Sequence, residues 1–240
     1  MVAKIFYRLT LVISLSFSSL SANADYTFNL LDMLGGTSSY AYGINDSGQI
    51  VGSITGANGT TSATLWSNGT TAYLDSLGGS YNTAIGINAS GQIISGNYIN
   101  GTSADNGAYR ATIWNGGTIT ELGTLGGTGS VANSINASGD VVGFSSNSGN
   151  LANLATLWSN GNVIDLNSFL PQSIKEAGWI LYSANAINDS GTIVGAASNS
   201  LLGISSQAFI LAAVPEPKTN LMLLMGLGLL GFMARSRKAT

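Results

Sequence analysis

The chain has 240 residues, with no cysteine, no histidine and only 8% charged residues. Without cysteine it forms no disulfide, so a fold outside the cell would depend on packing alone. The same absences exclude Ser-His-Asp and Cys-His nucleophiles, zinc sites of His or Cys, and haem-type ligation. Any enzymatic chemistry is restricted to carboxylates, hydroxyls, Lys175 and hard metal ions.

Charge is distributed unevenly along the chain. Six of the eight basic residues lie near the termini, and residues 25–213 hold only Arg110 and Lys175 against ten acids, a net charge of −8. Because two cations cannot neutralise a phosphate backbone, nucleic acid is not an expected partner, and we expect no cofactor. An acidic polysaccharide would need neutral hydrogen bonds, stacking or bridging metal ions.

The first 24 residues have the features of a secretory signal peptide. Lys4 and Arg8 make the start positive, residues 9–20 are apolar with interspersed serine, and Ala22 and Ala24 fit the small-x-small rule for cleavage. We therefore expect an exported protein whose mature chain begins near residue 25.

Residues 25–212 form an internal repeat. Leu-Gly-Gly recurs from Leu34, Leu77 and Leu125, and an Asn-x-Ser-Gly segment recurs from Asn45, Asn88, Asn136 and Asn188. An Ala-Thr-x-Trp segment recurs from Ala63, Ala111 and Ala155, with Ala208 starting a weaker fourth copy. The isoleucine before each Asn-x-Ser-Gly segment sets the spacing at 43, 48 and 52 residues. Such periods indicate a propeller or another repeat architecture.

The sequence of each unit predicts four short strands. In the first unit, residues 41–44 and 49–53 flank the turn that starts at Asn45, because Asn caps its own turn and Gly48 supplies a positive φ. Residues 62–66 and 71–74 flank Asn68-Gly69, the dipeptide typical of a tight hairpin. The fold class is therefore all-β.

Four strands per unit favour a four-bladed β-propeller with about 47 residues per blade. Residues 26–32 precede the first Leu-Gly-Gly as residues 71–75 precede the second, whereas the last unit lacks its fourth strand. We expect the N-terminal strand to complete the last blade and close the ring, which would remove exposed sheet edges. The alternative is an open or head-to-tail array whose unpaired ends join another copy.

The repeats resemble the extracellular HAF-repeat family, in which "GIN..GQIVG" and "LG.LGG" segments recur. The nearest copy of the motif that names the family is Gln207-Ala208-Phe209, and the other units have Ala-Thr instead. The family is defined by repeats rather than by a reaction, so the resemblance implies a fold and an extracellular location but little biochemistry.

Residues that recur in every unit belong to the framework. We interpret the turn asparagines as turn parts and Trp66, Trp114 and Trp158 as packing residues. The Leu-Gly-Gly segments lack the Gly-Lys-Ser/Thr of a phosphate loop, so they predict tight crossings between units. Asp46 and Asp189 lie in no Asp-x-Asp-x-Asp run, so we expect exposed turn acids and no metal site.

Segments that do not recur are the candidates for binding. The crossing into the last unit is expanded over residues 168–179 and carries Lys175, Glu176 and Trp179; the longest loop between second and third strands carries Asp105, Tyr109 and Arg110. In antiparallel blades these loops and crossings share one face, and binding residues often lie on such variable loops. The alternative is that the crossing only covers one end of the ring.

The C-terminal segment, residues 213–240, has three parts. Val214, Pro215, Glu216 and Pro217 interrupt regular structure, residues 219–234 are uncharged and mostly apolar, and Arg235, Arg237 and Lys238 follow. This order resembles the PEP-CTERM sorting signal of exopolysaccharide-producing Gram-negative bacteria. The resemblance implies that an exosortase in the membrane removes the helix, which at about 24 Å is short for a lasting span. The alternative is a retained anchor.

Three functions from different classes remain. The sequence favours a non-enzymatic surface or matrix protein, an inner-membrane precursor that is then displayed or secreted, with exosortase and exopolysaccharide or other matrix components as partners. A carbohydrate-binding propeller is the alternative. A glycan-cleaving enzyme with two carboxylates is disfavoured because Asp105, Glu121, Asp165 and Glu176 show no recurrent pairing.

Overall fold

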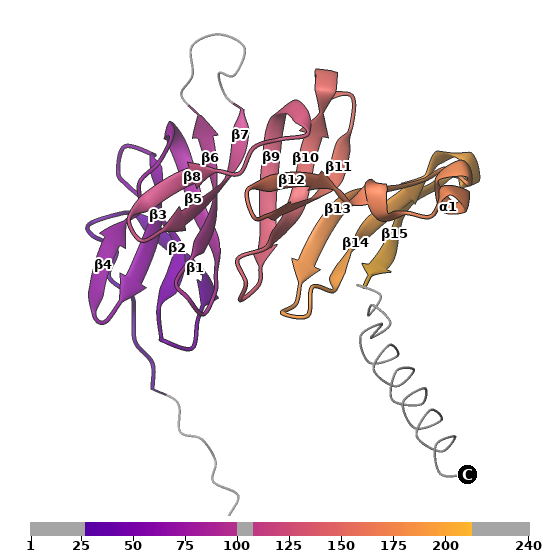
Figure 1. The fold of residues 1–240 in the computed structure, drawn as a ribbon. Helices are drawn as coiled ribbons and strands as arrows, with labels where there is room; N and C mark the ends of the chain where they lie inside the picture. Colours follow the sequence, from indigo (N-terminus) through magenta and orange to yellow (C-terminus); the bar gives the residue numbers. More distant parts are fainter. Residues whose placement is uncertain (1–26, 100–107, 213–240) are drawn as a thin grey trace, which may run out of the picture. The chain divides into compact units, whose positions relative to one another are not determined.

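The structure, a computed structural model, describes residues 27–99 and 108–212. The chain divides into two units, Met1–Leu31 and Asp32–Thr240. In the first unit, residues 27–31 carry neither helix nor strand; every described element belongs to the second unit. The described part of that unit is all-β apart from short helical turns, as the sequence predicts (Figure 1).

The first repeat folds as four antiparallel strands. They are β1 (Ser38–Ile44), β2 (Ile50–Thr55), β3 (Thr61–Ser67) and β4 (Thr70–Tyr73). Between β1 and β2, the Oδ1 of Asn45 accepts from the amides of Ser47 at 3.1 Å and Gln49 at 3.0 Å. Between β3 and β4, Asn68 and Gly69 have φ of 50° and 73°, as a type I′ hairpin requires. Both predicted turns are confirmed.

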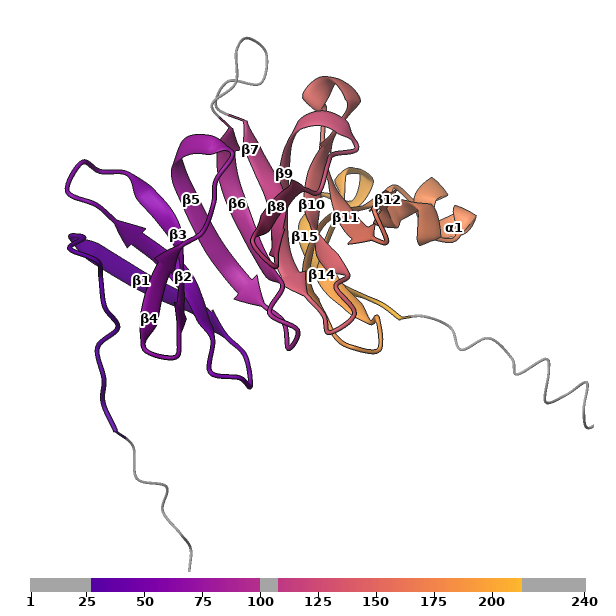
Figure 2. The same ribbon diagram turned by 60° about the vertical axis from the view of Figure 1, so that its left-hand side comes forward.

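The other repeats follow the same plan. Repeat 2 has β5 (Gly78–Ile87), β6 (Ile93–Ile99), β7 (Tyr109–Asn115) and β8 (Thr118–Glu121). Repeat 3 has β9 (Gly126–Ile135), β10 (Val141–Asn147), β11 (Asn153–Ser159) and β12 (Asn162–Asp165). Repeat 4 has β13 (Trp179–Ile187), β14 (Ile193–Asn199) and β15 (Ile204–Leu211). A single bridge between Thr61 of β3 and Tyr81 of β5 joins repeats 1 and 2 into one sheet. Figure 2 shows these two strands side by side.

Consecutive repeats pack face to face through three apolar clusters. The face of a repeat that meets the preceding repeat is its leading face, and the opposite face is its trailing face. Between repeats 1 and 2, the trailing Val51 and Ala63 meet the leading Ala84 and Ile93, and each is at most 1% exposed. Each Val or Ile buried in this way contributes about 1.5–3 kcal/mol.

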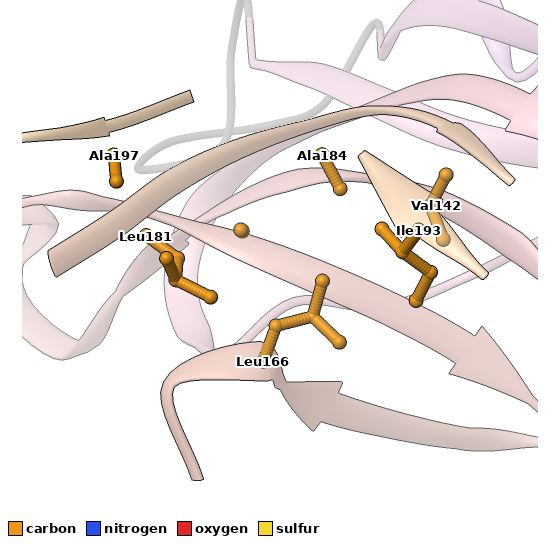
Figure 3. Close-up of a cluster of buried hydrophobic side chains, with 7 residues drawn as sticks. Val142, Leu166, Leu181, Ala184, Ile193 and Ala197 are labelled. Atoms are coloured by element: carbon orange, nitrogen blue, oxygen red, sulfur yellow. The ribbon is translucent and has the colours of Figure 1, made fainter. Parts of the chain in front are cut away.

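The same positions form the next two clusters. Ile94 and Ala111 meet Ala132 and Val141 between repeats 2 and 3, and Val142 and Ala155 meet Ala184 and Ile193 between repeats 3 and 4. Figure 3 shows the last cluster, which also contains Leu166, just after β12, and Leu181 of β13. The repetition of one packing pattern explains why the sequence conserves small and branched residues at fixed offsets within its own repeats.

Small residues on the first strand of a repeat are explained by close approach. A Cβ added to Gly43 would lie 3.3 Å from the Cα of Gly86 in the next repeat. That contact is tighter than side chains ordinarily make, so the first strands of repeats 1 and 2 require small residues where they meet.

The repeated tryptophans pack inside the fold, which confirms their interpretation as framework. Trp66 and Trp158 are 4% and 3% exposed. Their indole Nε1 atoms donate to the backbone oxygens of Asp32 at 2.8 Å and Gly123 at 3.2 Å. Asp32 and Gly123 occupy equivalent positions, so the segment that enters a repeat crosses over the tryptophan of that same repeat.

The predicted ring closure is not shown by the structure. Residues 27–32 form no strand, and the sheet of repeat 4 contains three strands, β13, β14 and β15. Phe28 and Leu30 are 85% and 84% exposed, so the segment lacks the alternating burial of a paired strand. The prediction of a strand over residues 26–32 is therefore corrected for its described part. The hydrogen bond from Trp66 to the carbonyl of Asp32, the last residue of this segment, ties the segment's end to repeat 1.

The two predicted terminal signals fall outside the part of the chain that the structure describes. The signal peptide with Ala22 and Ala24, and the C-terminal segment from Val214 to Arg237, lie outside the described residues. Among the residues that are described, no helix has the length and apolar character needed to cross a membrane.

Candidate functional site

The expanded crossing into repeat 4 is built on a hydrogen-bonded turn. It contains a 3-10 helix, η2 (Leu166–Phe169), and the short helix α1 (Gln172–Glu176). Asp165 Oδ1 accepts from the amide of Asn167 at 2.8 Å and so caps η2. Asn167 in turn donates to the carbonyl of Leu181 at 2.9 Å and accepts from its amide at 2.8 Å. These two bonds fix the crossing to β13.

Lys175 and Glu176 are exposed, like the other residues of α1. Gln172 Nε2 donates to Glu176 Oε1 at 3.0 Å, and Lys175 Nζ donates to the carbonyl of Ser168 at 3.4 Å. Both partners belong to the crossing itself, so the two charges are held in place at the surface and remain open to solvent on their outer sides.

Trp179 lines a shallow hollow beneath the crossing. The hollow has a volume of about 230 Å³, and its walls include Leu170, Ile174, Trp179, Gln207, Ala208 and Phe209. Its walls are mostly apolar, with Gln207 as the polar group, a lining typical of small-molecule sites although the volume is below their usual range of about 300–1,000 Å³. Sequence reasoning identified Trp179 here but used Gln207-Ala208-Phe209 only as a family motif.

A second hollow lies against η2. Its volume is about 390 Å³, and its lining includes Leu157, Leu166, Phe169, Ile193 and Leu211. This set shares Leu166 and Ile193 with the cluster between repeats 3 and 4, so the hollow is an extension of that interface toward solvent. Within residues 27–99 and 108–212, no titratable side chain lines this hollow.

The second candidate group lies in repeat 2. Tyr109 begins β7, and its ring occupies the space above Gly96, where any side chain would collide with it. Arg110 is 8% exposed, and its Nε lies 3.2 Å from Glu121 Oε1 on β8. This ion pair holds β7 to β8, and ligand binding by Arg110 stays a prediction. Asp105 lies outside the described residues.

The loops between second and third strands lie at the same end of the strands as the crossings between repeats, as predicted. The amide of Thr128, near the start of β9 and just after the crossing into repeat 3, donates to Asn150 Oδ1 in the β10–β11 loop at 2.8 Å. Asn199, the last residue of β14, donates to the carbonyl of Ala177 in the crossing into repeat 4 at 2.7 Å. The structure nevertheless does not unite the two candidate groups, because repeat 3 packs between repeats 2 and 4.

The turn asparagines have a second role that sequence reasoning missed. Asn45 Nδ2 donates to the carbonyl of Asn88 at 3.1 Å, Asn88 to that of Asn136 at 3.0 Å, and Asn136 to that of Asn188 at 3.4 Å. We call this series the asparagine ladder. The recurrence of Asn at this position was the available signal, but one turn viewed alone explains Asn without any neighbour.

Comparison with known proteins identifies one part of the chain. Residues 213–238 match the PEP-CTERM protein-sorting motif. No curated protein matches the chain. The match contains Val214, Pro215, Glu216, Pro217, Arg235 and Arg237, the residues predicted to form the sorting signal. The motif implies processing by an exosortase and is consistent with export and sorting to the cell surface.

Proposed function

We propose that this chain is an exported, non-enzymatic surface or matrix protein of an exopolysaccharide-producing Gram-negative bacterium. The observation that carries the proposal is the PEP-CTERM match over residues 213–238, at the opposite end of the chain from a signal-peptide pattern. In this account residues 1–24 direct export, residues 25–212 are the repeat body, and residues 213–240 sort the precursor.

The chemistry of the tail supports a precursor rather than a permanent anchor. Pro215 and Pro217 keep the segment around Glu216 out of helix and sheet, so an enzyme can bind it in extended form. The short apolar stretch gives only a marginal span, and Arg235 and Arg237 hold its far end on the cytoplasmic side. The precursor waits in the inner membrane until the exosortase cuts it.

Replacing residues 215–217 with three alanines tests this role. The variant keeps both the apolar stretch and the basic end, so we expect it to be exported but to accumulate uncut in the inner membrane. The control replaces Thr219 with Ala, which leaves the tripeptide intact and should be processed normally. Processing of the triple variant at the normal rate would contradict the proposal.

Carbohydrate binding is a second candidate for the body, favoured by the hollow beneath the crossing. Trp179 offers an aromatic wall, and the exposed Gln207 offers hydrogen bonds. Co-sedimentation of the full chain with the exopolysaccharide of its host tests this. We expect Gln207→Ala to lower retention several-fold and Gln49→Ala, in the turn of repeat 1, to leave it unchanged. Equal retention of wild type and Gln207→Ala would remove this candidate.

A further inference from the structure

The trailing face of repeat 4 presents to solvent the positions that every other repeat buries. Val194 is 41% exposed, whereas the equivalent Val51, Ile94 and Val142 are each 0% exposed. Ala208 is exposed, whereas the equivalent Ala63, Ala111 and Ala155 are at most 1% exposed. Next to them, Ile210 is 70% exposed. Terminal repeats of a finished array carry a polar outer face, and this one does not.

The leading face of repeat 1 is exposed in the same way. Ile44 is 67% exposed, whereas its equivalents Ile87, Ile135 and Ile187 pack against the three clusters between repeats. Ala41 is exposed, whereas its equivalents Ala84, Ala132 and Ala184 are at most 1% exposed. Repeat 1 therefore exposes a leading face of the kind that covers the trailing face of every repeat except repeat 4.

The asparagine ladder lacks a donor at one end and an acceptor at the other. The carbonyls of Asn88, Asn136 and Asn188 each accept two bonds, one from the glycine of their own turn and one from the preceding asparagine. Among the described residues, the carbonyl of Asn45 accepts from Gly48 alone, at 2.9 Å. At the other end, Asn188 is exposed, and its Nδ2 donates to no acceptor within the described ranges.

We propose that the trailing face of repeat 4 binds the leading face of repeat 1 of a second copy of this chain. The contact continues the internal interfaces by one step: Val194, Ala208 and Ile210 cover Ala41 and Ile44 of the second copy. The Nδ2 of Asn188 donates to the carbonyl of its Asn45. Such a head-to-tail contact is heterologous, so each added copy leaves the same two faces available.

A second copy fits better than closure within one chain. Both faces are exposed in the same molecule while all three internal clusters and the ladder between them are formed. The occupant must match an interface built from small and branched apolar residues with one amide-to-carbonyl bond. The opposite end of another copy supplies each of those groups at the required spacing, because it is made by the same repeat.

Cysteine pairing tests the contact directly, because the chain contains no cysteine. Between repeats 3 and 4 the amide of Ala137 donates to Asp189 Oδ1 at 2.8 Å. Ala137, Asp189 and Asp46 occupy the same turn position in their repeats. In the proposed contact, position 189 of one copy therefore lies next to position 46 of the second copy. Asp46 and Asp189 are both exposed, so Asp46→Cys and Asp189→Cys should leave the fold intact.

The full chain is produced with each substitution separately, and the two proteins are mixed in mild detergent and oxidised. We expect a disulfide-linked dimer that contains one of each, and a series of higher species from the double variant. Adding Ile210→Arg to the Asp189→Cys protein should lower the yield about tenfold, because it places a charge in an apolar contact. Arginine at the exposed Leu151, away from both faces, is the matched control and should not lower it.

Two results would overturn the proposal. The first is a double variant that forms only a monomeric internal disulfide, which would mean that the ring closes within one chain. The second is a dimer yield from the mixed proteins no higher than that of Asp46→Cys mixed with Leu151→Cys. Export and tail processing are not read out in this experiment, so either result leaves the proposed function standing.

Discussion

The side-chain amide of Asn88 donates to the carbonyl of Asn136, 3.0 Å away in the next repeat. The Oδ1 of the same side chain accepts from the amide of Gln92 at 2.9 Å and so shapes its own turn. One residue therefore forms a turn and joins two repeats. This double role explains why asparagine occurs at this position in all four repeats, when a turn alone would also accept aspartate.

Replacing Asn88 with alanine should destabilise the fold more than replacing Asn188. Asn88 is 6% exposed and loses both turn and ladder bonds, whereas the exposed Asn188 loses only turn bonds. With about 1 kcal/mol per hydrogen bond, Asn88→Ala should cost about 1–2 kcal/mol more. Urea unfolding of the two variants measures the difference. Equal losses would mean that the ladder adds no stability.

Enlarging a small residue should lower the free energy of unfolding only where that residue is buried between two repeats. Ala84 is fully buried in the cluster between repeats 1 and 2, and Ala41 is its exposed equivalent on repeat 1. Overpacking by Ala84→Leu should lower the free energy of unfolding by about 1–3 kcal/mol, and Ala41→Leu should change it by less than about 0.5 kcal/mol in dilute protein. A similar loss at both positions would contradict the assignment of these faces.

The two indole nitrogens at equivalent positions differ in bonding and should differ in energetic value. Trp158 Nε1 donates to the carbonyl of Gly123 at 3.2 Å, whereas the buried Trp114 Nε1 has no partner among the described residues. Trp158→Phe should therefore cost about 1 kcal/mol more than Trp114→Phe, since it leaves a carbonyl without its donor. Thermal unfolding of both variants checks this, and a larger loss at Trp114 would refute it.

Arg110 should contribute to stability. It is 8% exposed and paired with Glu121, whose side chain is 40% exposed. Removal of the guanidinium by Arg110→Ala should cost about 2 kcal/mol, less than for a fully buried pair because solvent screens the glutamate. Lys175→Ala, at the exposed side of α1, serves as the control and should cost less than about 0.5 kcal/mol. An unchanged melting temperature for Arg110→Ala would contradict the structural role.

The strands could be predicted from sequence because local chemistry determines them. Asn45 and Gly48 specify one turn, and Asn68-Gly69 specifies the next, so the strands between them follow. Ring closure could not be predicted in the same way, since it depends on how successive faces pack rather than on any one segment. The segment at residues 27–32 has the composition of a strand but lacks the burial that would make it one.

The candidate site was only partly accessible to sequence reasoning. Trp179 was identified because it lies outside the repeat pattern, and the structure places it in the hollow beneath the crossing. Gln207 was not singled out as a binding residue, because its place in that wall depends on the crossing folding over β15. Arg110 stood out as one of only two cations in the body, and a charge count cannot show that Glu121 pairs with it.

The most direct test of the proposed function is the intact mass of the protein recovered from the cell surface or the medium. The account predicts a chain that starts near Asp25 and ends near Pro217, with or without an added group at its new C-terminus. Both signals are then absent from the mature protein, and only the repeat body with its two exposed end faces remains. A surface protein that still carries residues 235–240 would contradict the account and make the tail a retained anchor.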